Sequence, residues 1–131
     1  MKNLTCIVCP IGCSLDVDDH DNDNLSVTGN RCARGAAYAK EEIRAPKRIV
    51  TATVPIVLKD CETDVFSVRR IPVKTTAACL KEKIPQLLAD IYKITVNLPV
   101  KVGDILIKDW NKEGFDIITT RSFNVTQFKC E

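Results

Sequence analysis

The sequence predicts an α+β protein: an N-terminal four-cysteine module made of a β-hairpin and a helix, followed by a small β-rich α+β domain. Three observations lead to this prediction. Four of the seven cysteines fall within the first 32 residues, several short apolar stretches have the length and alternation of strands, and one later stretch repeats its apolar residues at helical spacing. We place the boundary after residue 48, which gives domains 1–48 and 49–131.

The first module is predicted to run as strand, turn, strand and helix. Ser14–Asp18 alternates polar and apolar residues, as a short strand does. Residues 19–24 hold only Asp, His and Asn, which favour a turn, and residues 25–28 predict the returning strand. Ala33–Arg44 is rich in Ala, Lys and Glu, so we expect a helix that ends before Pro46.

The second domain is predicted to pack a helix on a small sheet. Runs rich in β-branched and aliphatic residues predict strands at 50–58, 65–68, 94–100, 104–108 and 116–122. Apolar residues recur at helical spacing between Leu80 and Ile91 and predict a helix over about 81–93, with its regular part beginning near Pro85. We expect residues 72–75 to form a loop or a short extended segment, and residues 102–104 a tight turn.

Composition excludes several classes of protein. The 131 residues are 45% hydrophobic and 27% charged, as in globular domains and unlike disordered chains. A net charge of +2, from 19 basic and 17 acidic residues, lacks the concentrated basic face that nucleic acids need. No apolar run approaches the roughly 18–20 residues of a transmembrane span, and the first residues are not a secretory signal, so we expect a cytoplasmic protein. The single histidine, His20, excludes a His-based triad within the chain.

The cysteines are the outlier of this composition. Their odd number and the lack of an export signal argue against a disulfide framework. Four of them follow the spacing C-x2-C-x3-C-x18-C, namely Cys6, Cys9, Cys13 and Cys32. The first three span a single short loop that contains Pro10 and Gly12, and the predicted hairpin brings the fourth back to them. Thiolates that converge in this way are expected to hold a metal.

Three interpretations of these four residues remain open. A cubane iron–sulfur cluster suits three crowded cysteines and one remote cysteine, since each must reach a different corner. Structural zinc also takes four thiolates, although zinc sites more often present two separated pairs. The third interpretation is that all four are reduced, buried thiols without a metal.

Other candidate residues carry weaker signals. Asp19, Asp21 and Asp23 have the spacing of a calcium loop, but the required Gly and Glu are absent, so we expect a solvated hairpin tip that also exposes His20. Trp110 is expected to be a partly buried loop aromatic, with a stacking platform as the alternative. The three remaining cysteines have no ligand spacing and are expected to be buried or free thiols, Cys61, Cys79 and Cys130.

The cysteine motifs resemble those of a family of small bacterial and archaeal proteins of unknown function. The matching segments are CIVCPIGC at residues 6–13 and GNRCARG at 29–35. Further matches follow at Tyr38, Ala39, Glu42, Pro46, Arg48, Thr51, Thr53, Val54 and PVKT at 72–75. The resemblance implies a metal-binding protein associated with FAD-dependent dehydrogenases of the glycerol-3-phosphate type.

About the first 35 residues are also similar to the N-terminal iron–sulfur segment of molybdopterin oxidoreductases. That segment has C-x2-C-x3-C, a longer gap, and then C-x-[KR]-G. The resemblance implies a [4Fe–4S] cluster held by Cys6, Cys9, Cys13 and Cys32. It also implies that Arg34 is the basic residue beside the cofactor. The gap is shorter here and the large pterin-binding domains are missing, so molybdenum chemistry is not expected.

The sequence and these resemblances together predict an iron–sulfur electron-transfer protein. We expect an accessory subunit that passes electrons from a flavoprotein dehydrogenase and has no independent enzymatic activity. Positive charge from Arg31 and Arg34 would favour the reduced, more negative cluster and raise its potential. The alternative is a non-redox binding module stabilised by zinc.

Overall fold

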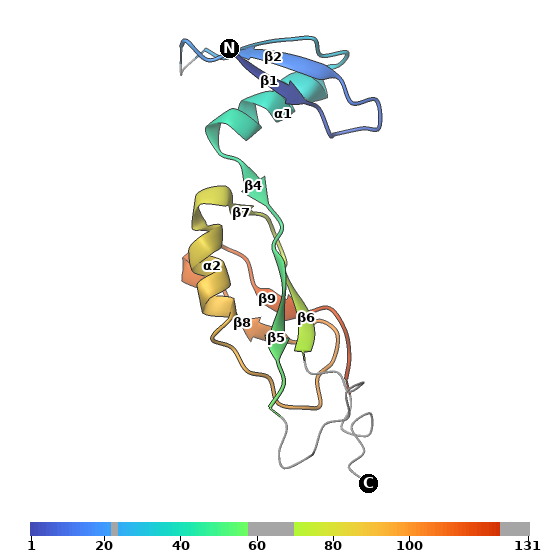
Figure 1. Cartoon of the computed structure of the whole chain (residues 1–131), viewed down its shortest axis with the longest axis vertical. Helices are drawn as coiled ribbons and strands as arrows, with labels where there is room; N and C mark the ends of the chain where they lie inside the picture. Colours follow the sequence, from blue (N-terminus) through green and yellow to red (C-terminus); the bar gives the residue numbers. More distant parts are fainter. Residues whose placement is uncertain (22–23, 58–69, 124–131) are drawn as a thin grey trace. The chain divides into compact units, whose positions relative to one another are not determined.

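The computed structural model describes residues 1–21, 24–57 and 70–123, and the chain divides into two compact units (Figure 1). Unit 1 is Met1–Pro46 and unit 2 is Lys47–Glu131, so the division lies at 46/47 against the 48/49 expected from the sequence. Pro46 disfavours helical backbone at the residue before it, which explains why the helix of unit 1 ends here. The fold is a small α+β fold with two α-helices and several antiparallel sheets in the described residues.

Unit 1 is a three-stranded sheet with one helix. Its elements are β1 (Lys2–Thr5), β2 (Ser14–Asp18), β3 (Ser26–Thr28) and α1 (Ala33–Arg44). The strands are antiparallel in the order β1-β2-β3, with Leu4 opposite Leu15 and Val17 opposite Val27. Alternation along β2 sends Leu15 and Val17 to one face of the sheet, where both are fully buried.

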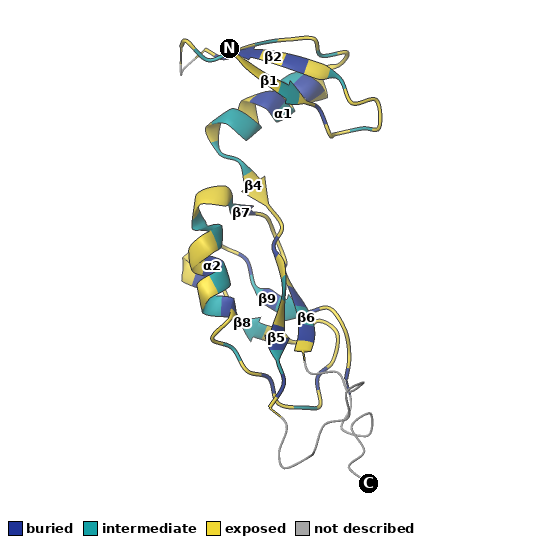
Figure 2. Cartoon of the chain, viewed as in Figure 1, coloured by how far each residue is buried: buried dark blue, intermediate teal, exposed yellow. Residues whose placement is uncertain are grey.

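The core of unit 1 lies between this sheet face and α1, and it is small. Its buried members are Cys6, Leu15, Val17, Leu25 and Ala39. Figure 2 shows dark buried positions on β2 and on the side of α1 that meets it. Small residues on α1 allow the close approach, since Gly35 and Ala39 are the two buried residues of the helix.

Unit 2 contains a four-stranded sheet and a two-stranded sheet. Its elements are β4 (Lys47–Arg48), β5 (Thr51–Pro55), β6 (Arg70–Thr75), β7 (Cys79–Leu80), η1 (Lys81–Lys83), α2 (Ile84–Ile91), β8 (Ile105–Ile107), η2 (Trp110–Lys112) and β9 (Ile117–Thr119). The larger sheet has the order β5-β6-β9-β8, and β4 pairs with β7.

The core of unit 2 is much larger than that of unit 1. Leu87 and Ile91 of α2 are buried in it together with Ile71 and Ile117 of the sheet. Trp110 is 3% exposed, so it is more deeply buried than the sequence led us to expect. Its ring stacks on Phe115 with centroids 5.8 Å apart, and its indole N–H donates to Asp90 over 2.9 Å. This partner satisfies the indole nitrogen and lets the whole side chain enter the core.

Several predicted elements are confirmed. The strand Ser14–Asp18 and the helix Ala33–Arg44 have the predicted bounds, and the returning strand at 25–28 is β3. The regular part of α2 begins next to Pro85, after the single turn of η1. The turn at 102–104 is present, with Gly103 at φ +87°. The strand β1 was not predicted from the sequence.

For residues 72–75 the extended segment, one of the two predicted alternatives, is confirmed, because they belong to β6, an inner strand of the larger sheet. Pro72 is the reason that the sequence left a loop open as the other alternative. A proline lacks the N–H that an inner strand normally donates. The pairing of β6 with β9 ends at Val73 and Thr119, so Pro72 lies just beyond it, and its carbonyl accepts bonds from the N–H and the hydroxyl of Thr120.

Three predicted strands differ from the structure. Residues 94–100 form only isolated bridges at Val96 and Val100. The strands predicted at 104–108 and 116–122 are present as the shorter β8 and β9. The strand predicted at 65–68 lies outside the described residues. None of the described helices is long and apolar enough to cross a bilayer.

Candidate metal centre

The first three cysteines lie in the loop that joins β1 to β2. The Cys6 N–H donates to the Cys13 carbonyl over 2.8 Å and closes this loop at its base. Gly12 adopts φ +64°, a conformation that glycine enters without the penalty that a Cβ brings. Cys6 is buried, whereas Cys9 and Cys13 are partly exposed.

Cys6 points toward the first turn of α1. A Cβ built on Gly35 would lie 3.7 Å from the Cys6 sulfur, so the helix backbone passes directly beside this thiol. The same Cβ would lie 3.1 Å from the Asn30 Cβ, which leaves little room for any residue larger than glycine. Gly35 therefore sets the distance between the helix and the cysteine loop.

Cys32 is the residue at which α1 begins. It has extended backbone, φ −149°, and it is exposed. Its thiol does not make the hydrogen bond of a regular N-cap. The Gly35 N–H, followed by the side chain and N–H of Arg34, nevertheless lowers the pKa of the Cys32 thiol. These donors favour the thiolate, which is the form that binds metals.

Arg34 links Cys32 to the loop cysteines. Its hydrogen bond to Cys32 is the main cause that raises the pKa of the Arg34 guanidinium, and the nearby charges of Cys9 and Cys6 add to the effect. The guanidinium therefore lies within electrostatic reach of three of the four candidate thiols. Negative charge on those sulfurs would also be favoured by the N-terminal end of α1.

These sulfurs are nevertheless not gathered around one point. Throughout the described ranges, no three Cys, His, Asp or Glu side chains lie close enough together to hold a metal ion. Cys79 is buried on β7 in unit 2, where desolvation raises the pKa of its thiol. Cys61 and Cys130 lie outside the described residues.

The described acidic residues of the hairpin tip after β2 do not converge on one point. The Asp19 carboxylate lies 3.1 Å from the Lys2 ammonium, and this hydrogen bond lowers the pKa of Asp19. The imidazole of His20 is exposed, as expected from the sequence, and lies 3.7 Å from Asp18. Asp23 lies outside the described residues.

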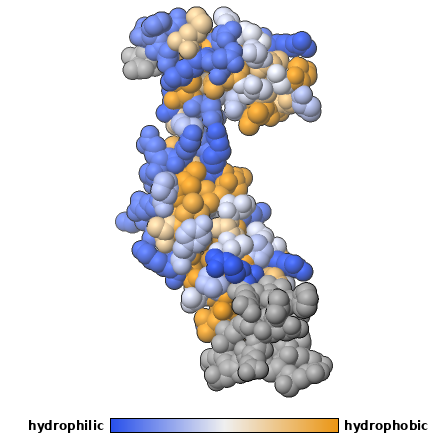
Figure 3. Space-filling view, viewed as in Figure 1, coloured by the Kyte–Doolittle hydropathy of each residue, from blue (hydrophilic) through white to orange (hydrophobic). Residues whose placement is uncertain are grey.

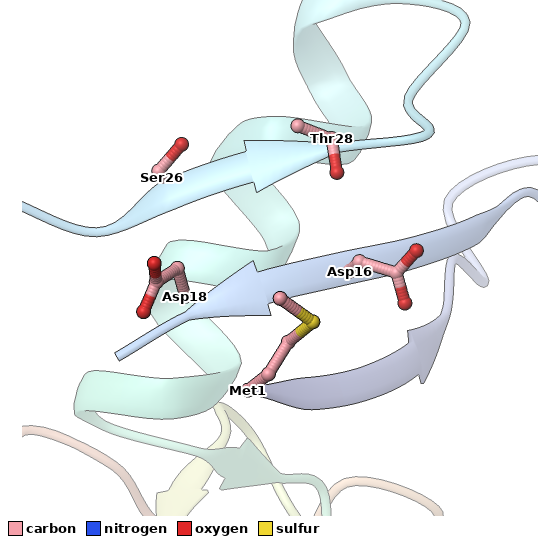
Figure 4. A pocket seen from close by; sticks show the side chains of 5 residues that line it. All are labelled: Met1, Asp16, Asp18, Ser26 and Thr28. Carbon is pink, nitrogen blue, oxygen red and sulfur yellow. The ribbon is translucent and has the colours of Figure 1, made fainter. Parts of the chain in front are cut away.

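A shallow pocket lies on the sheet of unit 1, on the face away from α1 (Figure 4). Its lining residues are Met1, Asp16, Asp18, Ser26 and Thr28. Asp16 accepts a 2.8 Å bond from the Asn3 amide and Asp18 accepts a 3.2 Å bond from the His20 N–H, so both carboxylates already have partners. Sequence reasoning did not select this pocket, although alternation along β2 places both acidic residues on one face. Two solvated carboxylates on an open sheet do not by themselves form a binding site.

The two units define a class of protein: a small α+β protein whose N-terminal unit carries four cysteines at the end of the sheet where α1 begins. Comparison with known families is more specific. The chain belongs to the family described as "Protein of unknown function (DUF1667)", which matches residues 33–121. The match begins one residue after Cys32, so all four cysteines precede it.

Two further comparisons complete this picture. No curated protein matches the chain. The NMR structure of the Clostridium perfringens protein CPE0013 is similar over 60% of this chain and 85% of that chain, with 23% identity and a TM-score of 0.49.

Proposed function

We propose that this protein binds a [4Fe–4S] cluster through Cys6, Cys9, Cys13 and Cys32 and transfers single electrons. The observation that carries the proposal is the approach of Cys6 to the first turn of α1, where a Cβ on Gly35 would lie 3.7 Å from the Cys6 sulfur; Arg34 in the same turn has its pKa raised by Cys32, Cys9 and Cys6. A cation beside several thiols stabilises their deprotonated form, which is the form that ligates a metal.

The donor set agrees with this cofactor. All four candidate ligands are sulfur, which suits iron–sulfur clusters and zinc rather than magnesium or calcium. Cys9 and Cys13 lie on a partly exposed loop, so closing the site requires that loop to draw its thiols toward Cys32. Cys6 is already held against α1 by its contact with Gly35. Binding would thus order the loop around two elements that the fold already positions.

When bound, the cluster would supply one-electron redox chemistry, and the protein would tune its potential. Arg34 would offset the charge of the thiolates and raise that potential, because a nearby cation favours the more reduced state. We further propose that the electrons come from a flavoprotein dehydrogenase in the cytoplasm. This partner follows from the sequence resemblance and not from a contact in the structure.

One observation favours a second candidate, a non-redox binding module with structural zinc. Within its described residues, the core of unit 1 has five buried members, and units of this size commonly need a metal or disulfides to remain folded. Four thiolates around Zn²⁺ would supply that stabilisation without any change of oxidation state.

Anaerobic purification followed by metal and acid-labile sulfide analysis tests both candidates. Four irons and four sulfides per chain, with broad visible absorption that dithionite bleaches, are the expected result. One zinc per chain in a colourless protein would replace the redox function with the structural one. A chain that binds neither metal under these conditions would exclude both.

A further inference from the structure

The cysteine loop has an unusual orientation of its side chains. Its three cysteines are buried or partly exposed, whereas its aliphatic residues face solvent. Ile7 is 73% exposed, Ile11 is 60% exposed and Val8 is 44% exposed. Figure 3 shows hydrophobic side chains gathered at the end of unit 1 where this loop lies.

Such a cluster is costly for a small unit to leave in water. A single exposed aliphatic residue is ordinary, but several in one short loop are typical of a surface that contacts another molecule. The loop is closed at its base by the bond from Cys6 to Cys13, so its exposed side chains stay within one short segment of unit 1. We propose that Ile7, Val8 and Ile11 form a docking face for a redox protein that exchanges electrons with the cysteine centre.

Charge indicates the chemistry of the partner. No charged residue occurs between positions 4 and 15, and only Arg31 and Arg34 occur between 25 and 39. Acidic residues begin at Asp16 and continue into the turn at the opposite end of β2. Arg34 is engaged with the thiols, whereas Arg31 is exposed beside them. The matching surface is therefore apolar at its centre, with a carboxylate at its rim for Arg31.

Size and composition favour a transient protein partner over the alternatives. Three aliphatic side chains fall short of the roughly 800 Å² that each partner of a stable complex buries, whereas electron-transfer contacts are small. A second copy of the chain is disfavoured, because the positive charges of Arg31 and Arg34 would face the same two charges of the other copy. A membrane surface is disfavoured, because the loop has no Trp, Tyr or Phe to anchor it at the lipid boundary. Docking at this loop would bring the partner directly beside the four thiols.

This inference rests on the proposed function, and photo-crosslinking in the cells that make the protein tests it separately. A photo-crosslinking amino acid is placed at Ile7 or, as the control, at Ile49. Ile49 is 62% exposed in unit 2 and so matches Ile7 in type and exposure. The expected result is an adduct at position 7, identified by mass spectrometry as a flavin or iron–sulfur protein, and no such adduct at position 49. An adduct with lipid, with a second copy or with a protein that has no redox cofactor would overturn the proposal, as would no adduct.

The captured protein then serves as the partner in a rate measurement. Substituting both Ile7→Ser and Ile11→Ser is expected to slow electron transfer between the two proteins at least about tenfold, because apolar contact area is lost. Reduction by dithionite and the iron content should stay unchanged, and so should every property of Ile49→Ser. An unchanged rate with the partner would overturn the docking face while leaving the cluster in place. Loss of iron from the wild-type protein would instead overturn the proposed function.

Discussion

The two units of this protein differ in the interactions available to stabilise their folds. Among the residues that the structure describes, the core of unit 2 has fourteen buried members, whereas that of unit 1 has five and unit 1 carries all four clustered cysteines. Unit 2 has the larger apolar core, and its one described cysteine, Cys79, is part of that core. Unit 1 has little apolar area to bury, so additional bonds at its thiols would matter far more. The two units therefore differ in how much of their stability apolar burial can supply.

The largest expected effect on the difference between the two units comes from Cys9→Ser. Cys9 is only partly buried and is not among the core residues of unit 1, so its packing contributes little. If metal binding stabilises the unit, losing one ligand removes a contribution of about 10 kcal/mol or more. We expect loss of the metal and collapse of the NMR shift dispersion for residues 1–46, while signals from unit 2 are retained.

Cys79→Ala is the matched control for this experiment. It removes a buried thiol from unit 2, where it should cost some stability. The metal content should stay at the wild-type level. Equal loss of metal in the two variants would contradict the ligand assignment. A fully dispersed unit 1 in Cys9→Ser would show that its small core is sufficient.

The second prediction concerns the core of unit 2. Leu87 is fully buried on α2, so Leu87→Ala should lower the free energy of unfolding of unit 2 by about 2–5 kcal/mol through lost contacts and a residual cavity. Tyr92→Ala at the end of the same helix should change it by less than about 0.5 kcal/mol, because Tyr92 is 59% exposed. Urea denaturation followed by the fluorescence of Trp110 measures both. Similar effects of the two variants would contradict the assignment of this core.

Sequence reasoning succeeded where local chemistry determines the element. The turn residues after Asp18 and the Ala-rich composition of α1 were sufficient to give the bounds of β2 and α1. It was incomplete where tertiary context overrides local preference. Pro72 is accepted in β6 only because the neighbouring strand β9 ends at that point, and no local pattern contains that information. Likewise, β1 depends on pairing with β2 and has little strand character of its own.

For the candidate site, too, the sequence predicted one part and missed another. Spacing alone selected the four cysteines, and the structure places Cys6, Cys9 and Cys32 within reach of the Arg34 charge. The outward orientation of Ile7 and Ile11 could not be predicted, because apolar residues between cysteines usually suggest a core. Only the exposed fraction of each side chain distinguishes a loop whose aliphatic residues pack inside the unit from a loop whose aliphatic residues face solvent.

The third prediction compares two glycines with similar backbone. Gly29 and Gly114 have φ values of +84° and +80°, so alanine is strained at both by about 1–2 kcal/mol. At Gly29 the added Cβ would also lie 2.2 Å from the Ser14 carbonyl oxygen, whereas nothing lies within 4 Å at Gly114. Gly29→Ala should therefore separate β3 from β2 and destabilise unit 1 well beyond the strain alone.

Gly114→Ala supplies the reference value for backbone strain without a clash. Hydrogen exchange of the amides in β2 and β3 measures the first variant, and thermal unfolding of unit 2 measures the second. Equal destabilisation by the two substitutions would mean that the contact between the added Cβ and the Ser14 carbonyl oxygen is relieved without further loss of stability.

The smallest expected effect is on the titration of Cys32 in the metal-free protein, measured with an added osmolyte that keeps unit 1 folded without the metal. The Gly35 N–H is the main cause that lowers the pKa of this thiol, and Arg34 adds to it. A lowered pKa increases the thiolate fraction at a given pH, and the thiolate is the species that iodoacetamide alkylates. Arg34→Ala should raise the pKa toward its ordinary value, so the pH midpoint of alkylation moves upward, although only in part because Gly35 remains.

Arg31→Ala is the control that separates a specific contact from net charge. Both variants lose one positive charge near Cys32, but Arg31 is not among the groups that lower the pKa of Cys32. Its alkylation midpoint should therefore match the wild type, measured by mass spectrometry of the Cys32 peptide across a pH series. An Arg34→Ala midpoint equal to those of Arg31→Ala and the wild type would mean that Arg34 makes no specific contact with Cys32. In that case Arg34 would no longer connect the start of α1 to the thiols of Cys9 and Cys6.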